Sequence, residues 1–180
     1  MHRNDYRKRG AVTSVHPDEM RRALRRFASG VTIVTAELDG EQLGITVSAF
    51  ASISLMPPIV MVSINNESPL RDAVITSEHF AVHILSDAQR SLAERFSQPV
   101  PSSEKYREVA FILGPSGAPM LSDTLASIDC VLEQTIAIGS HMVMFGRVVY
   151  AEAAGKEVEP LIYYNRGYRS LGDPTEGSSS

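Results

Sequence analysis

Residues 44–70 read GITVSAFASISLMPPIVMVSINNESPL, and this stretch contains the main indications of both fold and function. It is rich in β-branched residues and is divided by Pro57-Pro58, which predicts two strands separated at the prolines. If the first strand is continuous, alternation gives it one small, polar face and one apolar face. The polar face holds Gly44, Thr46, Ser48, Phe50 and Ser52, and the apolar face holds Ile45, Val47, Ala49 and Ala51.

The polar face has two interpretations. It faces water, as in any half-exposed antiparallel strand, or it lines a ligand site, because short hydroxyl-bearing side chains leave room close to the backbone. A helix is predicted next, with Ser68 as N-cap and Pro69 at the first helical position. Free N–H groups there, together with Ser68 and Arg71, favour a bound phosphate, although plain capping equally explains Ser68.

The chain before this stretch predicts an amphipathic helix. Residues 16–30 carry a proline and two acidic residues in the first turn and a glycine at the end, which are helix start and stop signals. Met20, Leu24 and Phe27 recur at helical spacing, so we expect them to face the core.

The remaining segments predict mostly strands. An Asp-Gly pair at 39–40 indicates a hairpin turn, and the Pro, Ser and Gly content of 98–118 indicates a long surface loop. Strands are expected at 31–38, 79–85, 125–139 and 141–153, with a helix capped by Ser86 over 86–97 and a short final element at 161–171.

Hairpin-connected strands with inserted helices favour an antiparallel barrel or α+β fold, mainly β, over a doubly wound sheet. Neither a G-x-G-x-x-G string nor a P-loop string occurs, so no Rossmann or P-loop nucleotide site is predicted. We expect one domain over 16–172, between a basic tail at 1–15 and a polar tail at 173–180, both disordered.

Composition excludes several classes of protein. The 180 residues carry a net charge of −4, which argues against nucleic-acid binding as the main activity. The single cysteine, Cys130, rules out an intrachain disulfide and fits a reducing compartment. No signal peptide and no apolar run long enough for a membrane span are visible, so we expect a cytoplasmic protein with no membrane partner.

Two motifs in the opening stretch resemble the flavin-binding strands of the flavin reductase-like family, the reductase components of two-component flavin monooxygenases. They are G-I-T-V-S-A-F-x-S-x-S-x-x-P-P and the following V-S-I-N-x-x-S. The resemblance extends from about Met20 to Leu171 and includes FASGVTIVTA, LAERFS and YYNRGYR.

This resemblance implies a six-stranded antiparallel, Greek-key FMN-binding split barrel that forms a homodimer. It also implies an NAD(P)H:flavin oxidoreductase that reduces FMN or FAD with NADH or NADPH and passes reduced flavin to a separate monooxygenase. Its implied flavin-lining residues are Thr46, Val47, Ser48 and Ala49, and its implied ribityl- and phosphate-binding residues are Ser63, Ile64, Asn65, Ser68 and Arg71.

The family commonly has Gly-Asp-His where this chain has Gly139-Ser140-His141. The resemblance implies that His141 positions the nicotinamide, and the missing aspartate leaves its charge state open. On its residues alone, His141 is also explained as a histidine in a hairpin turn. Arg166 and Tyr168 match a segment that closes over the site in relatives, with surface pairing and packing as the alternative.

Two competing functions remain open from the sequence. A flavin carrier or redox sensor on the same barrel would bind flavin without reductase activity, and an FMN-dependent oxidase would consume its own organic substrate. A metal site is not predicted, because His79 and His83 lack further ligands at suitable spacing and read as satisfied histidines near the barrel surface.

Overall fold

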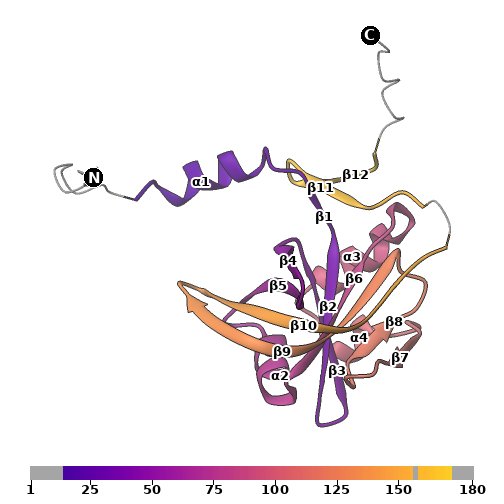
Figure 1. The fold of residues 1–180 in the computed structure, drawn as a ribbon. Helices are drawn as coiled ribbons and strands as arrows, with labels where there is room; N and C mark the ends of the chain where they lie inside the picture. The colour runs from indigo at the N-terminus through magenta and orange to yellow at the C-terminus, as the bar shows by residue number, and fades with distance from the viewer. Residues whose placement is uncertain (1–13, 156–157, 172–180) are drawn as a thin grey trace.

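The computed structural model describes residues 14–155 and 158–171 of the chain (Figure 1). Its centre is a seven-stranded antiparallel sheet with strand order β3-β2-β6-β9-β10-β5-β4. The strands are β2 Thr32–Leu38, β3 Glu41–Val47, β4 Phe50–Leu55, β5 Pro58–Asn65, β6 His79–Ile84, β9 Ala126–Ile138 and β10 His141–Ala153. The predicted tails at 1–15 and 173–180 lie outside the described residues except for Ser14 and Val15.

Two small sheets and four α-helices complete the described chain. One small sheet joins β1 Ser29–Gly30 to β11 Ile162–Tyr164 and β12 Gly167–Arg169, and the other pairs β7 Phe111–Leu113 with β8 Pro119–Leu121. The helices are α1 Pro17–Leu24, α2 Pro69–Ser77, α3 Arg90–Ser97 and α4 Ser102–Lys105, with a 3-10 turn, η1 Asp87–Gln89, leading into α3.

Local signals fix several of these elements as predicted. Leu38 pairs with Glu41, and Asp39 and Gly40 have φ of 53° and 82°, which is the geometry of a two-residue hairpin turn. Ser86 and Gln89 form a capping box at the start of η1. The antiparallel pairing of the seven-stranded sheet confirms the mainly-β, antiparallel fold class.

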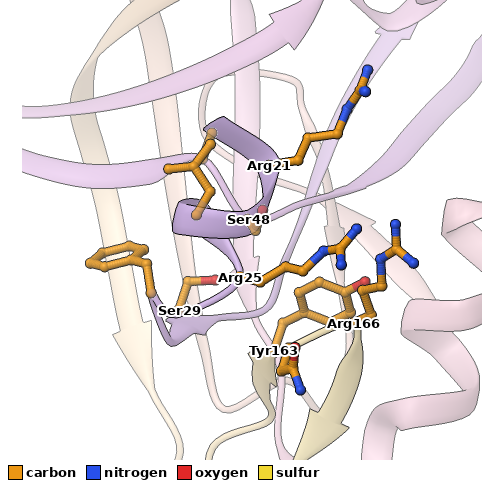
Figure 2. Close-up of a pocket in the computed structure, with 10 residues that line it drawn as sticks. Arg21, Arg25, Ser29, Ser48, Tyr163 and Arg166 are labelled. Atoms are coloured by element: carbon orange, nitrogen blue, oxygen red, sulfur yellow. The ribbon is translucent and has the colours of Figure 1, made fainter. Parts of the chain in front are cut away.

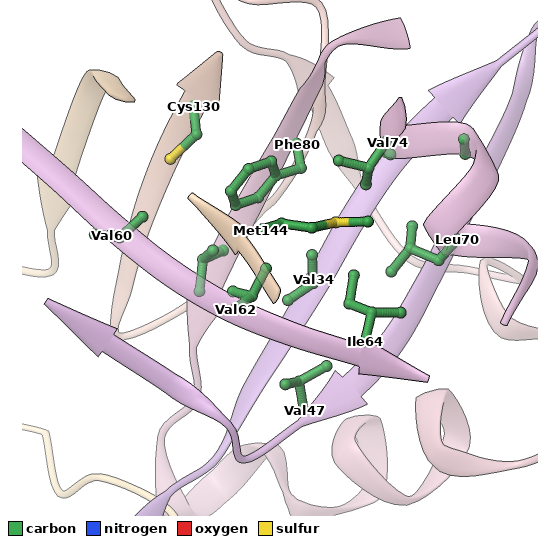
Figure 3. Packing of buried hydrophobic residues seen from close by; sticks show 13 residues of the cluster. Val34, Val47, Val60, Val62, Ile64, Leu70, Val74, Phe80, Cys130 and Met144 are labelled. Atoms are coloured by element: carbon green, nitrogen blue, oxygen red, sulfur yellow. The ribbon is translucent and has the colours of Figure 1, made fainter. Parts of the chain in front are cut away.

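The largest buried cluster lies between the sheet and α2, and a second one includes Ala93 and Phe96 of α3. Leu70, Ala73 and Val74 of α2 are fully buried and belong to the same cluster as Phe80 and Met144 (Figure 3). Because these side chains come from a helix and several strands, the packing fixes where α2 begins relative to the ends of β5 and β10.

The number of strands and the closure of the sheet differ from expectation. The described chain has a seven-stranded, unclosed sheet in place of the six-stranded barrel. The predicted strand through residues 44–52 is also broken, because β3 ends at Val47 and β4 begins at Phe50. The cause is a change of partner, since β3 pairs with β2 and β4 pairs with β5.

The expectation that α1 packs on the core is wrong. Met20, Leu24 and Phe27 are 55%, 56% and 73% exposed, and α1 has no buried residue. Figure 1 shows α1 standing apart from the seven-stranded sheet, whose covering helix is α2. The helix also ends at Leu24, earlier than predicted.

The expected loop at 98–118 is partly structured. It contains α4 and β7, and α4 is held by contacts with β3. Lys105 Nζ donates to the carbonyls of Gly44 and Phe96 at 3.1 and 3.2 Å, and Tyr106 Oη donates to that of Leu43 at 2.9 Å. These tertiary hydrogen bonds hold the segment in a defined structure, although its composition alone indicates a loop.

Candidate functional site

Two adjoining hollows meet at the break between β3 and β4. The first, which we call the arginine pocket, has a volume of about 470 Å³ and is lined by Arg21, Arg25, Ser48 and Arg166 among others (Figure 2). The second, the tyrosine pocket, has a volume of about 240 Å³. Both hollows are lined by Ser48 and Tyr163, so they adjoin at these residues, and we refer to the two together as the recess.

Ser48 and Ala49 form the link between the two strands and are exposed in the recess. The link is positioned by its neighbours: Thr32 Oγ1 donates to the carbonyl of Val47 at 2.7 Å, and Ser63 N donates to that of Ala49 at 3.1 Å. The backbone here is therefore fixed on both sides while the small side chains leave the recess open.

Thr46 and Tyr168 line the tyrosine pocket. Thr46 Oγ1 donates to the carbonyl of Ala93 at 2.6 Å, which leaves the hydroxyl oxygen able to accept a bond. Tyr168 packs edge-to-face against Tyr163 with ring centroids 5.5 Å apart, and Arg90 lies 5.5 Å above its ring. Partial burial raises the pKa of Tyr168, so its hydroxyl stays protonated near neutral pH.

A second group of predicted residues gathers where the end of β5 meets the β9–β10 turn. Asn66 N donates to the carbonyl of Ser140 at 2.9 Å, and Asn66 Nδ2 donates to that of Gly139 at 3.3 Å. His141 is the register partner of Asn65. These bonds bring Asn65 and Asn66 together with Gly139 and His141, which are far from them in sequence, and Ser68 N donates to the carbonyl of Asn65 at 3.0 Å.

Ser68 has an orphaned hydroxyl at the start of α2. It occupies the N-cap position, but its Oγ makes no capping bond and is buried without a partner among the described residues. Arg71 lies one turn further on, where its Nε donates to Asp72 Oδ1 at 2.9 Å. An unsatisfied hydroxyl at a helix N-terminus fits a phosphate or ribityl oxygen that would complete its bonding.

His141 is exposed at the rim of this second group. Its Nδ1 lies 2.9 Å from Ser140 Oγ, so the serine that replaces the family's aspartate still contacts the imidazole. A neutral hydroxyl orients the ring through this bond without adding the charge of a carboxylate.

Val47 and Ile64 were predicted to bind flavin, but their side chains are buried in the core, so mainly their backbone atoms are available to a ligand. Their side chains are 7% and 1% exposed and belong to the core cluster. Ser63 and Arg166 keep accessible side chains, and Arg166 lines the arginine pocket. The room beside Gly44 is not free for a ligand, because a Cβ there would lie 2.6 Å from Phe96 Cε1.

The two strand histidines differ from expectation. His83 is fully buried, with Nε2 3.0 Å from Thr35 Oγ1 and Nδ1 3.0 Å from Ser127 Oγ. Because Thr35 Oγ1 donates to the carbonyl of Pro119, it accepts from His83 Nε2–H, which sets a neutral tautomer. Burial lowers the pKa of His83 to about 3. His79 Nε2 is buried without a partner, and within the described residues no cluster of three metal-ligating side chains occurs.

Sequence reasoning missed Arg21, Arg25 and Tyr163 as residues of the recess. The two arginines belong to the predicted amphipathic helix, whose charged face normally meets water, and Tyr163 was not among the predicted site residues. The available signal was the concentration of aromatic and basic residues in YYNRGYR, but nothing local links that segment to α1.

Comparisons with known proteins agree with this arrangement. A family model described as flavin reductase like domain matches residues 24–172. The chain is 34% identical to FMN reductase (NADH) RutF of Bradyrhizobium diazoefficiens over 92% of each chain. It is also 34% identical to HsaB, the reductase subunit of a flavin-dependent monooxygenase of Rhodococcus jostii, over 89% of this chain and 81% of that protein.

A solved structure has the same fold. Streptomyces globisporus NADH:FAD oxidoreductase SgcE6, in complex with NAD and FAD fragments, superimposes with a TM-score of 0.81 at 26% identity. The match covers 90% of this chain and 98% of that one.

Proposed function

This chain belongs to the flavin reductase-like family, and from that membership we propose that it is an NAD(P)H:flavin oxidoreductase. It takes FMN or FAD as acceptor and NADH or NADPH as hydride donor, and it supplies reduced flavin to a partner monooxygenase. The observation that carries the proposal is the exposed Ser48–Ala49 link, which is fixed on both sides and lies where two hollows meet.

The tyrosine pocket and the Ser48–Ala49 link suit a flavin ring, because the side chains that line the tyrosine pocket are small, aliphatic or aromatic and their polar atoms are hydroxyl groups. Bound flavin supplies hydride-transfer chemistry at its N5 atom. Ser48 and Ala49 would lie against the ring, and Thr46 Oγ1 would offer an acceptor to it. Their role is to orient the ring and to exclude water from one of its faces.

The phosphate end is assigned to the start of α2. Ser68 Oγ, which has no partner, and the first N–H groups of a nine-residue helix would bind the phosphate. Arg71 would add a positive charge, partly offset by its bond to Asp72. Asn65 and Ser63 lie between this end and the Ser48–Ala49 link, in line with the ribityl chain.

His141 is assigned to the nicotinamide side. It is exposed, it lies beside Asn65, and Ser140 fixes its ring through Nδ1, which leaves Nε2 directed away from that bond. Gly139 has a φ of 57°, which allows the tight turn that brings His141 to this position. Its role is to bind and orient the donor.

The quaternary state belongs to the same proposal. A homodimer would cover Met20 of α1, which is exposed in the single chain and lies outside the arginine pocket. The finer fold, a split barrel, is supported by the antiparallel strand order and the match to SgcE6.

We place the protein in the cytoplasm because its one cysteine, buried Cys130, suits a reducing compartment. No helix in the described chain is long and apolar enough to span a bilayer.

The test is to mix the purified chain with FMN or FAD and excess NADH or NADPH and to follow the absorbance of the reduced nicotinamide. Catalytic consumption, with many nucleotides oxidised per chain, is the expected result. Stoichiometric flavin binding without consumption would reject the reductase in favour of a flavin carrier, the alternative that replacement of the family's aspartate by Ser140 keeps open.

A further inference from the structure

The arginine pocket extends beyond the residues assigned to the flavin ring. It is bordered by the end of α1 and by the turn between β11 and β12. Of the residues assigned to the flavin ring, only Ser48 and Ala49 line it. Asn165 N donates to the carbonyl of Arg25 at 3.2 Å, which ties the turn to the end of the helix. The pocket is therefore assembled by two segments more than a hundred residues apart, and both contribute arginines.

The pocket is positively charged in a chain whose net charge is −4. Three arginines line it, and no aspartate or glutamate of the described chain does so. Arg21 donates to Asp18 at 2.7 Å, whereas Arg25 and Arg166 form no ion pair with any described residue. Figure 2 shows Arg25 and Arg166 extending past Tyr163 while Arg21 points away. Two guanidinium groups are thus available for an anion.

Arg166 is held in a backbone conformation that suits glycine. Tyr164 pairs with Gly167, so Asn165 and Arg166 are the two residues of a tight hairpin turn, with φ of 48° and 64°. Such turns prefer Asn followed by Gly, because a side chain at the second position is disfavoured at positive φ. An arginine in this position is a local conflict of the kind found at functional sites.

Much of the remaining lining is apolar or aromatic. Leu24 and Phe27 are 56% and 73% exposed, and Tyr163 joins them in the lining. Guanidinium groups recognise phosphate oxygens through paired hydrogen bonds, and aromatic faces stack on nucleobases. A volume of about 470 Å³ is within the range of small-molecule sites.

We propose that the arginine pocket binds the adenosine diphosphate half of a dinucleotide, with Arg25 and Arg166 on its phosphates and Phe27 and Tyr163 against its base. This inference rests on the proposed function for the identity of the dinucleotide. Both FAD and the nicotinamide donor contain this half, whereas FMN lacks it. Ser48 and Ala49 line this pocket together with the arginines, so the other half of a dinucleotide bound at the link would lie beside Arg25 and Arg166.

The direct test is calorimetric titration of the full chain with ADP. The wild type is expected to bind ADP, and Arg25→Gln is expected to weaken binding by about tenfold, the loss typical of a charge-assisted hydrogen bond. The matched control is Arg26→Gln, since Arg26 is exposed, adjacent and outside the pocket lining, and it is expected to bind as the wild type does. Absence of ADP binding by the wild type, or equal binding by Arg25→Gln, overturns the proposal.

Steady-state kinetics identify the source of the diphosphate. If it is FAD, Arg25→Gln raises the KM for FAD about tenfold and leaves the KM for FMN unchanged. If it is the nicotinamide donor, the KM for the donor rises when FMN is the acceptor. If the wild type binds ADP more tightly than Arg25→Gln but shows no turnover, the reductase is rejected and the ADP site is retained. Failure of the proposed function and failure of the proposed site are therefore distinguishable.

Arg166→Gly separates binding from folding. Glycine relieves the positive φ, so the melting temperature is expected to rise by about 2 °C. ADP affinity is expected to fall by about tenfold in the same protein. A merely structural role would not produce this combination, and unchanged ADP affinity in Arg166→Gly would remove Arg166 from the site.

Discussion

The helices α1 and α2 are built alike and packed differently. Each begins with a proline at its first helical position and carries an apolar face. Helix α2 buries Leu70, Ala73 and Val74 against the sheet, whereas α1 buries none of its residues. An apolar stripe therefore shows that a helix needs a covering surface, and it does not show that the same chain supplies it.

The contrast extends to the site. The end assigned to phosphate belongs to what we call the body, which comprises the seven-stranded sheet and α2. Helix α2 and the β9–β10 turn are bonded to the core strands there. The arginine pocket is built by the arm, which comprises α1, Arg25 and the β11–β12 turn. We expect substitutions in the body to change folding stability and substitutions in the arm to change binding.

The largest expected effect is on the body. Leu70→Ala should lower the free energy of unfolding by about 3 kcal/mol, because it leaves a cavity at a side chain that is 1% exposed. Urea denaturation measures this loss. The control is Leu24→Ala in the arm, for which we expect a change within about 0.5 kcal/mol. Equal losses in the two variants would contradict the division between body and arm.

The next effect is pH-dependent. The pKa of His83 is lowered from 6.5 to about 3 by burial, so below pH 6.5 the unfolded chain binds a proton that the folded chain does not. Its contribution to stability is present above pH 6.5 and is lost progressively toward pH 3. We expect a loss of about 2 kcal/mol between about pH 7 and pH 5 from this residue.

Urea denaturation across this pH range checks the prediction. His83→Gln should be less stable at neutral pH, since it disturbs the bonds to Thr35 and Ser127, but its stability should fall less steeply with pH. The same slope in both proteins would mean that other groups cause the acid sensitivity.

His141→Ala is expected to act on function alone. Because His141 is exposed, the free energy of unfolding should change by less than about 0.5 kcal/mol. NAD(P)H turnover should fall by at least about tenfold, well before flavin affinity is affected. Steady-state kinetics and flavin titration of the same sample measure both, and full turnover would remove His141 from the mechanism.

The smallest effect sharpens the comparison of the helices. Met20→Ala, on the exposed face of α1 and outside the arginine pocket, should leave the unfolding of the chain almost unchanged. It should weaken self-association by about 1 kcal/mol if a second copy covers this face. Sedimentation velocity over a range of concentrations measures the change, and an unaltered dimer would assign the face to another partner.

Elements with local signals were predictable from the sequence. The Asp39-Gly40 turn, the capping box at Ser86 and the helix start at Pro69 each depend on residues within one turn of chain. The family resemblance rested on the motifs at 44–58 and 62–68, and the comparisons confirm it. In the site, these motifs located the Ser48–Ala49 link and the start of α2.

Features that depend on distant segments were not predictable. The break after Val47 arises because the chain changes its pairing partner from β2 to β5. The exposure of α1 depends on which helices pack against the sheet, and among the described residues α2 does so while α1 does not. Lys105 and Tyr106 anchor a segment whose composition indicates only a loop. The arginine pocket needs Arg25 and Asn165 to meet, which no spacing in the sequence indicates.

The central claim is that flavin binds against the Ser48–Ala49 link, and the most direct measurement is a flavin titration of Ser48→Leu followed by flavin fluorescence. A leucine at this exposed position would fill the junction of the two hollows, so the account predicts loss of flavin binding with the fold retained. Ser122→Leu, at an exposed serine outside both hollows, is the matched control and should bind as the wild type does. Flavin affinity of Ser48→Leu equal to that of the wild type would contradict the account.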